Sequence, residues 1–256
     1  MNVRYRMFDP TGNLTLLVET PVEAAYQAET AARLLEAEPA AEQVGFLCAA
    51  PDADIALRMA GGEFCGNAAM CAAVCAAERG STDAGAFRVR VSGAEQPVGA
   101  SVVRGADGSW RGTVDMPQPR AIERVLLPGA GTVRVVRFDG ISHVLPETPM
   151  PRPLAEQSAR KWCGQLGADA LGVLFVDPQT ERMAPLVYVP GVDTLCWESA
   201  CASGTAAVGA ALFAERGERV RVTLRQPGGS LTIEADADAL RLTGTVRPGG
   251  PKEIEI

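Results

Sequence analysis

The stretch GGEFCGNAAMCAAVCAAERG at residues 61–80 places Cys65 directly before an alanine-rich run that ends in Glu-Arg-Gly. A second stretch, ESACASGTAAVGAALFAERG at residues 198–217, places Cys201 before a similar run with the same ending. Small apolar residues cover nearly every face of both runs, so we expect two buried helices that are apolar all round. The final glycine of each run lies where a helix C-cap belongs.

Matching elements flank both helices along the chain. The segments FRVRVSGAEQPVGASVV (87–103) and ERVRVTLRQPGGSLTIEA (218–235) each predict a strand, a Gln-Pro turn with glycine, and a second strand. Upstream, VGFLCA (44–49) and LGVLFVD (171–177) predict matching apolar strands. Self-similarity of this length indicates two copies of one supersecondary unit.

The repeat predicts an α+β fold with two pseudo-symmetric halves, each a mixed β-sheet wrapped round a central apolar helix. We place the N-terminal half at 1–118 and the C-terminal half at 119–256, with a proline- and glycine-rich linker near 116–132. The last strand, near 248–256, is free to return to either half. Apolar spacing over 22–38 predicts a separate amphipathic surface helix.

Composition excludes several classes of protein. A chain of 256 residues with 47% hydrophobic and 21% charged residues is long enough to bury a substantial core. The net charge of −7 argues against a nucleic-acid partner, which requires clustered basic residues. The most apolar run, TAAVGAALFA (205–214), is too short to span a bilayer, and no signal peptide is evident. We therefore expect a cytoplasmic protein with no membrane partner, whose seven cysteines are thiols.

Scarce residue types narrow the possible chemistry. His143 is the only histidine, and the sequence contains neither a G-x-S-x-G motif nor a phosphate-binding loop. Only two lysines are present, which leaves few candidates for a Schiff base with pyridoxal phosphate. Cys65, Cys71 and Cys75 have no usual zinc spacing. We expect neither a cofactor nor a metal.

A cysteine at the start of a helix has a distinct chemical environment. The helix dipole stabilises a negative charge there by about 0.3–1 kcal/mol, which favours a thiolate and lowers the pKa of a thiol. The N–H groups of the first turn can also hold a carboxylate. If the two halves pack with these helix starts facing each other, Cys65 and Cys201 meet across a small anion-binding cleft.

Such a pair of thiols suits the inversion of a carbon beside a carboxylate. One cysteine removes the proton as a thiolate, and the other delivers a proton to the opposite face as a thiol. Helix N-termini stabilise the negative charge that develops on the carboxylate. The simpler interpretation of a cysteine in an apolar segment is a small core residue, which we prefer for Cys48, Cys71, Cys75 and Cys163.

Four motifs resemble the diaminopimelate epimerase family, in the same order along the chain. EFCGNAAMC (63–71) and SACASGTAA (199–207) are similar to its two cysteine elements, and DPTGN (9–13) and GISHVLP (140–146) to its other two motifs. The resemblance implies two similar halves, an active site in the cleft between them, and no pyridoxal phosphate or metal. It also implies a homodimer that acts on a small-molecule amino acid, with Cys65 as one of two catalytic cysteines.

The resemblance and the neighbouring positions give the candidate site. The catalytic candidates are Cys65 and Cys201. The substrate-binding candidates are Asn13, Glu42, Gln43, Gly66, Asn67, His143, Glu198, Ala202 and Ser203.

Departures from that family bear on the substrate. Met70 and Ser199 replace two arginines of the diaminopimelate epimerases, which suggests a substrate whose far end is not a carboxylate. The segments WESACASGTAAVG (197–209) and QPGGSL (226–231) are more similar to the histidine racemases of staphylopine-type opine metallophore synthesis. This resemblance implies conversion of L-histidine to D-histidine.

Other functions stay open from sequence alone. The same motifs fit diaminopimelate epimerisation or a proline or hydroxyproline epimerase. A protein of a different class could use the cleft to bind an amino acid without chemistry, and facing thiols could also act as a redox sensor.

Overall fold

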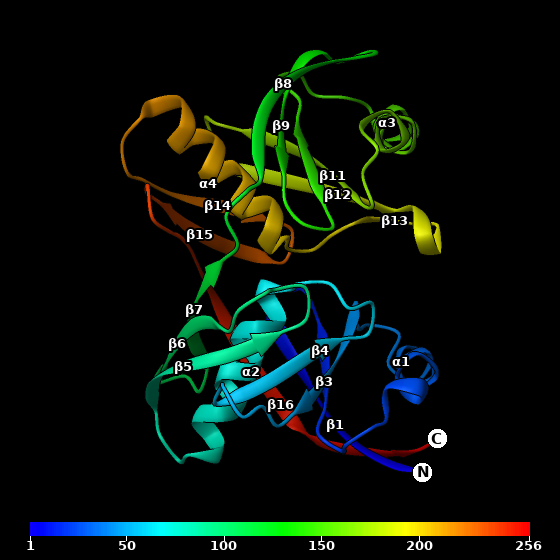
Figure 1. Ribbon diagram of the computed structural model, residues 1–256, viewed down its shortest axis with the longest axis vertical. Helices are drawn as coiled ribbons and strands as arrows, with labels where there is room; N and C mark the ends of the chain where they lie inside the picture. The colour runs from blue at the N-terminus through cyan, green and yellow to red at the C-terminus, as the bar shows by residue number, and fades with distance from the viewer. The chain divides into compact units, whose positions relative to one another are not determined.

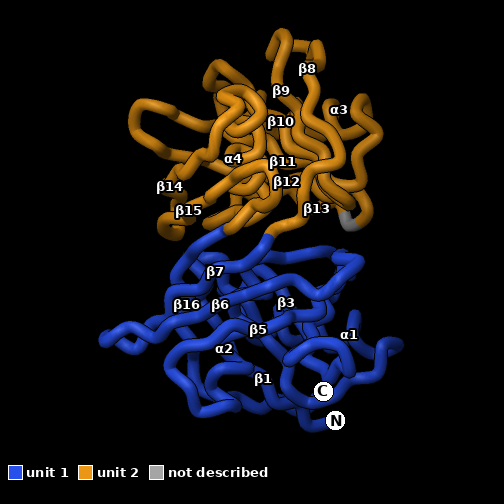
Figure 2. Tube along the Cα trace, turned by 60° about the vertical axis from the view of Figure 1, so that its left-hand side comes forward, with its two compact units in different colours: residues 1–115, 242–256 blue, residues 116–241 orange. Residues whose placement is uncertain are grey.

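A computed structural model describes residues 1–191 and 193–256 of the chain, and its elements are labelled in Figure 1. These residues form two compact units, one built from 1–115 with 242–256 and the other from 116–241 (Figure 2). The predicted division at 118/119 lies three residues from the observed boundary at 115/116, and the end of the chain belongs to the first unit.

Unit 1 is a closed mixed sheet with one helix inside it and one outside. Its elements are β1 (Asn2–Pro10), β2 (Thr15–Val18), α1 (Ala24–Ala37), β3 (Gln43–Cys48), β4 (Ile55–Met59), α2 (Gly66–Arg79), β5 (Ala84–Val91), β6 (Val98–Arg104), β7 (Trp110–Met116) and β16 (Leu240–Glu255). The strands pair in the order β1 to β7, and β16 pairs with both β7 and β1. Because β16 joins the two ends, the sheet of this unit has no open edge.

Unit 2 repeats the combination of a mixed sheet and two helices. Its elements are β8 (Ala121–Leu127), β9 (Gly131–Arg137), β10 (Ser142–Leu145), α3 (Arg152–Leu166), β11 (Leu171–Asp177), β12 (Arg182–Val189), β13 (Thr194–Trp197), α4 (Ala202–Arg216), β14 (Val220–Gln226) and β15 (Gly229–Ala235). The strands pair in the order β15, β14, β12, β11, β10, β9 and β8, while β13 pairs with β12.

Each parallel strand pair is connected through a helix, because a tight turn cannot join parallel strands. Along the chain, α1 lies between the paired strands β2 and β3, and α2 lies between β4 and β5. In the same way α3 lies between β10 and β11, and α4 lies between β12 and β14. Five strands of unit 1 pack against α2, namely β1, β2, β4, β5 and β6, and four strands of unit 2 pack against α4, namely β9, β10, β14 and β15. Every residue from Gly66 to Cys75 in α2 and from Gly204 to Ala211 in α4 is buried, which confirms the two predicted apolar helices.

The C-terminal ends of α2 and α4 agree in part with the predicted glycine caps. Gly217 ends α4 in the left-handed conformation, with φ of 68°. Gly80 ends α2 with φ of −80°, and the left-handed residue is the next one, Ser81, with φ of 52°. The N–H of Thr82 reaches back to the carbonyl of Ala77, as in a Schellman motif. The motif is therefore shifted by one residue in α2, and a serine takes the strained position.

The predicted linker over 116–132 holds only at its start, where the units divide at 115/116 and residues 117–120 connect β7 to β8. Residues 121–127 and 131–137 form the antiparallel hairpin β8–β9. Gly129 and Gly131, with φ of 81° and 72°, make its turn. The predicted amphipathic helix at 22–38 is confirmed as α1, over Ala24–Ala37. Across the described part of the chain, no helix is both long enough and apolar enough to cross a membrane.

Candidate active site

Cys65 is the N-cap residue of α2 in unit 1. Its backbone is extended, with φ of −130° and ψ of 109°, and the chain turns into the helix at Gly66. The sulfur accepts a hydrogen bond from the N–H of Ala68 at 3.4 Å. The Cys65 thiol also donates to Oε1 of Gln43 at 3.3 Å. Cys65 thus occupies the place of a serine N-cap, with a sulfur as the capping atom.

A network of polar side chains lies behind Cys65. Gln43 donates from Nε2 to Oδ1 of Asn13 at 2.6 Å and to Oγ1 of Thr15 at 2.8 Å. Asn13 in turn donates from Nδ2 to Oε2 of Glu42 at 2.6 Å. The network forms because Thr15 and Gln43 are partners in the parallel register of β2 and β3. Three of the candidate residues, Asn13, Glu42 and Gln43, are therefore connected to Cys65.

Cys201 has the same position at the start of α4 in unit 2. Its backbone is extended, with φ of −109° and ψ of 108°, and its sulfur accepts from the N–H of Gly204 at 3.4 Å. Oγ of Ser203 lies 3.6 Å from the sulfur and 3.0 Å from Nε2 of His143. Glu198 also forms a hydrogen bond with the Cys201 thiol. The candidates His143, Glu198 and Ser203 therefore gather round Cys201.

Electrostatics at Cys201 differ from the sequence expectation. Burial raises the pKa of the Cys201 thiol well above its usual value, and the charge and hydrogen bond of Glu198 raise it further. The Ser203 hydroxyl and the Gly204 N–H lower this pKa only in part. The expectation that the helix start lowers this thiol's pKa was therefore wrong, because burial and Glu198 outweigh the hydrogen bonds from Ser203 and from the Gly204 N–H. At neutral pH the Cys201 thiol is therefore protonated.

His143 is fully buried beside Ser203. Burial lowers the pKa of its imidazole to about 3, so the ring is neutral at physiological pH. In the parallel pair β10–β11, His143 lies beside Gly172. A Cβ atom on Gly172 would lie 2.2 Å from Nδ1 of His143, so only glycine leaves room for the ring. A direct contact between His143 and a substrate stays a prediction.

Two residues outside the predicted set hold the backbone of Cys201. The N–H of Cys201 donates to Oε1 of Gln226 at 2.8 Å, and Nε2 of Gln226 donates to Oγ1 of Thr205 at 2.9 Å. Thr205 closes the ring by donating to the carbonyl of Cys201 at 2.7 Å. All three residues are buried. The sequence showed Gln226 only as part of a turn motif, and it gave no signal for Thr205.

The segment before Cys201 is anchored by α3. Trp197 donates from Nε1 to Oε1 of Glu156 at 2.9 Å and stacks on Phe175, with ring centroids 5.7 Å apart. The guanidinium of Arg152 lies 4.7 Å from the centre of the Trp197 ring. The N–H of Glu198 donates to the carbonyl of Pro185 at 3.0 Å. These contacts fix the strand end from which Glu198 extends.

The remaining candidates lie in the first turns of the two helices. Gly66 and Asn67 begin α2, and Ala202 begins α4. The N–H groups of a helix's first turn lack acceptors within the helix, so both starts suit a carboxylate. Met70 lies one turn further along α2 and is fully buried against Gly112. Position 70 therefore packs the core of unit 1.

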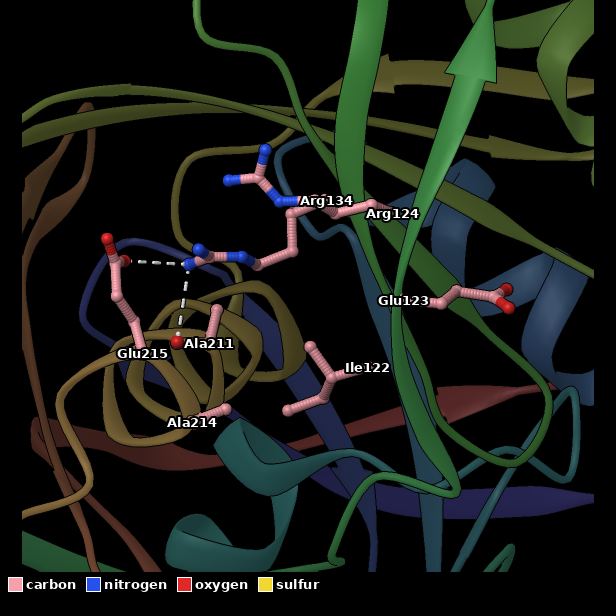
Figure 3. A pocket seen from close by; sticks show the side chains of 7 residues that line it. All are labelled: Ile122, Glu123, Arg124, Arg134, Ala211, Ala214 and Glu215. Atoms are coloured by element: carbon pink, nitrogen blue, oxygen red, sulfur yellow. Dashed lines mark hydrogen bonds and ion pairs between the residues drawn. The ribbon is translucent and has the colours of Figure 1, made fainter.

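One surface hollow lies away from both cysteines. It is lined by Ile122, Glu123, Arg124, Arg134, Ala211, Ala214 and Glu215 (Figure 3). Arg134 donates to the carbonyl of Ala211 at 3.2 Å and pairs with Glu215 at 3.1 Å. An arginine at the carbonyl end of a helix stabilises the helix dipole. We therefore assign Arg134, which lines this hollow, a structural role: it stabilises the C-terminal part of α4, at the end of the helix away from Cys201.

Solved structures share this fold along nearly the whole chain. A predicted epimerase from Pseudomonas aeruginosa matches with a TM-score of 0.74 at 16% identity, over 99% of both chains. A probable proline racemase from Agrobacterium radiobacter matches with a TM-score of 0.71 at 14% identity, over 99% of this chain and 93% of that one. The chain thus shares its fold with both of these proteins.

The sequence comparisons are more specific. The family described as "Histidine racemase CntK N-terminal domain" matches residues 2–247. A histidine racemase from Staphylococcus aureus is 29% identical over 243 residues, which cover 90% of this chain and 88% of the relative. A histidine racemase from Fusobacterium nucleatum is 27% identical over 248 residues, covering 93% and 91%.

Fold and relatives together define the chain as a racemase, an isomerase of amino acids. Within this class, the chain belongs to the histidine racemase CntK N-terminal domain family.

Proposed function

We propose that the chain inverts the Cα carbon of free histidine by a two-base mechanism in which Cys65 and Cys201 exchange protons with the substrate. The observation that carries the proposal is the same feature in each unit. A cysteine caps a buried helix and accepts the N–H of the third helical residue through its sulfur. Membership of the histidine racemase family supports histidine as the substrate.

The proposed chemistry is balanced in protons and needs no electron transfer. The Cα–H bond of one enantiomer breaks as one cysteine thiolate takes the proton. The electron pair spreads into the substrate carboxylate, where the N–H groups of a helix start stabilise it. The other cysteine gives its S–H proton to the opposite face of Cα. The two cysteines end with their protonation states exchanged, and the reverse reaction restores them.

The polar groups near each thiol provide the proposed substrate contacts. The N–H groups of Gly66 and Asn67, or of Ala202 and Ser203, would hold the carboxylate. The acidic side chains Glu42 and Glu198 would receive the α-ammonium and the imidazole. An ammonium beside Glu198 would also weaken the effect of that carboxylate on Cys201, so binding would favour the thiolate that the reaction needs.

We also propose that the two halves are pseudo-symmetric copies of one unit, divided near residue 118. Support comes from the corresponding elements of the two halves. Each half has a pair of parallel strands joined through a helix that a cysteine caps, and a hairpin follows that helix. A cytoplasmic location, a homodimer and a role of the product D-histidine in opine metallophore synthesis stay predictions from the sequence.

A substrate panel tests the proposed activity. Purified protein under reducing conditions should convert L-histidine to a mixture of both enantiomers, measured by chiral chromatography. L-proline, trans-4-hydroxy-L-proline and LL-diaminopimelate, tested side by side, should react far more slowly or not at all. Preferred turnover of any of those three would overturn histidine as the substrate. Saturable histidine binding without any racemisation would instead support an amino-acid-binding protein.

A further inference from the structure

The amide of Gln43 faces the Cys65 thiol at hydrogen-bond distance. We infer that Thr15 and the Glu42–Asn13 pair fix this amide so that its carbonyl oxygen holds the Cys65 proton, which keeps Cys65 a thiol in the resting enzyme. The inference rests on the proposed function, because it assigns the resting protonation state of one of the two proposed catalytic cysteines. It makes Thr15 a positioning residue that acts through Gln43.

Thr15 fixes one end of the amide. Its side chain is fully buried, and its hydroxyl donates its single proton to the backbone carbonyl of Asn13 at 2.9 Å. Towards Gln43 the Thr15 oxygen can therefore only accept a hydrogen bond. The group of Gln43 that lies 2.8 Å from this oxygen must be the NH2 group.

Glu42 and Asn13 impose the same orientation independently. An ionised carboxylate only accepts hydrogen bonds, so the Asn13 atom 2.6 Å from Glu42 must be the amide nitrogen. The Asn13 oxygen then faces Gln43 and accepts its second N–H at 2.6 Å. Both N–H groups of Gln43 are used, and both constraints place them on the side away from Cys65.

The carbonyl oxygen of Gln43 is left facing the sulfur of Cys65 at 3.3 Å. A carbonyl oxygen carries no proton, so it bonds to the thiol form and repels the thiolate form of cysteine. Cys201 also has an acceptor, the Glu198 carboxylate, whose charge and hydrogen bond favour the thiol form there. At Cys65 the acceptor is an amide whose orientation is fixed by Thr15 and by the Glu42–Asn13 pair.

Site-resolved alkylation tests this inference without any need for turnover. Iodoacetamide labelling of the full chain is followed at the Cys65 peptide by mass spectrometry, at pH 7 and at an alkaline pH where the labelling rate no longer rises. Gln43→Leu removes the acceptor and should raise the pH 7 rate roughly 3- to 10-fold, from the loss of one hydrogen bond. The labelling rate of Cys65 at alkaline pH should not change, because Cys65 is then ionised in the wild type and in the variant.

The positioning role of Thr15 has its own readout. Thr15→Val should raise the pH 7 rate by less than Gln43→Leu does, because the Glu42–Asn13 pair still restrains the amide, whereas Thr15→Ser, which keeps the hydroxyl, should behave as wild type. In the Gln43→Leu background Thr15→Val should add nothing, because Thr15 acts through the amide. Glu42→Leu, at an exposed position, removes the acceptor that orients Asn13 and gives the same readout if Thr15→Val fails to fold.

Two results would overturn the inference. One is an unchanged pH 7 rate in Gln43→Leu, and the other is an equal rise at both pH values, which would indicate only greater access to the sulfur. Neither result bears on whether the wild-type protein racemises histidine. A failure of the proposed function would appear as the absence of D-histidine in the substrate panel, whatever the alkylation rates.

Discussion

Replacing Cys65 with serine lowers the racemisation of histidine by about 10²- to 10⁴-fold, the range that positioned acid–base groups contribute. Replacing Cys201 with serine has an effect of the same size. A serine hydroxyl retains the capping hydrogen bond to the helix start, so the fold is preserved. It is not ionised at neutral pH, so it cannot serve as the base. The measurement is the initial rate of each enantiomer's conversion, followed by chiral chromatography.

Cys71→Ala is the matched control for this prediction. Cys71 lies in the same helix as Cys65 and is fully buried, but it does not cap the helix. Burial raises the pKa of its thiol well above the usual value, so it is un-ionised. The variant should retain racemisation close to that of wild type. A Cys65→Ser or Cys201→Ser protein that is folded and nearly as active as wild type would contradict the two-base mechanism.

Met70→Arg destabilises the protein by about 3–5 kcal/mol, because it places an unpaired charge in the core of unit 1. Met70 is fully buried, and its side chain packs against Gly112. This loss is a large part of the total stability of about 5–15 kcal/mol that is typical of a folded protein. Urea denaturation, monitored by circular dichroism, should show a lower midpoint or an unfolded chain in buffer.

Met70→Leu keeps the apolar volume and should cost less than about 1.5 kcal/mol. The comparison of the two variants separates the effect of charge from the effect of altered packing. If Met70→Arg were as stable as wild type and epimerised diaminopimelate, position 70 would be a determinant of the substrate. The structure gives it a core position instead, so the case for histidine depends on the family and not on this residue.

The buried helices and their cysteine caps could be predicted from the sequence because both signals are local. A helix that is apolar on all faces is stable in a soluble protein only where it is buried. The cysteine that caps each helix stands immediately before the first helical residue. The flanking strands could be predicted for the same reason. The strands β3 and β11, predicted at 44–49 and 171–177, lie at 43–48 and 171–177.

The length of the linker could not be predicted because proline and glycine mark a hairpin turn as readily as a linker. In Pro128–Gly131 they form the turn of β8–β9, and the strands on either side have weak apolar alternation. The return of the last strand to β1 also had no local signal. It depends on antiparallel pairing between the two ends of the chain, such as Asn2 with Glu255.

The hydrogen bonds that hold Cys65 and Cys201 come from residues that are distant in the sequence and are brought together only in the folded sheet. Thr15 reaches Gln43 only through the parallel register of β2 and β3, and Gln226 reaches Cys201 from the end of β14. No spacing in the sequence reports such contacts. The raised pKa of Cys201 was missed for a related reason, since the depth of burial follows from packing and not from the helix start.

Labelling in D₂O tests the two-base claim most directly. L-histidine is incubated with the protein in D₂O, the enantiomers are separated at low conversion, and deuterium at Cα is measured in each by mass spectrometry. The account predicts D-histidine with one deuterium at Cα and remaining L-histidine without it, because one thiol removes the proton and the other delivers a solvent-derived one. Protium retained in the D-histidine, or equal deuterium in both enantiomers, would contradict the account.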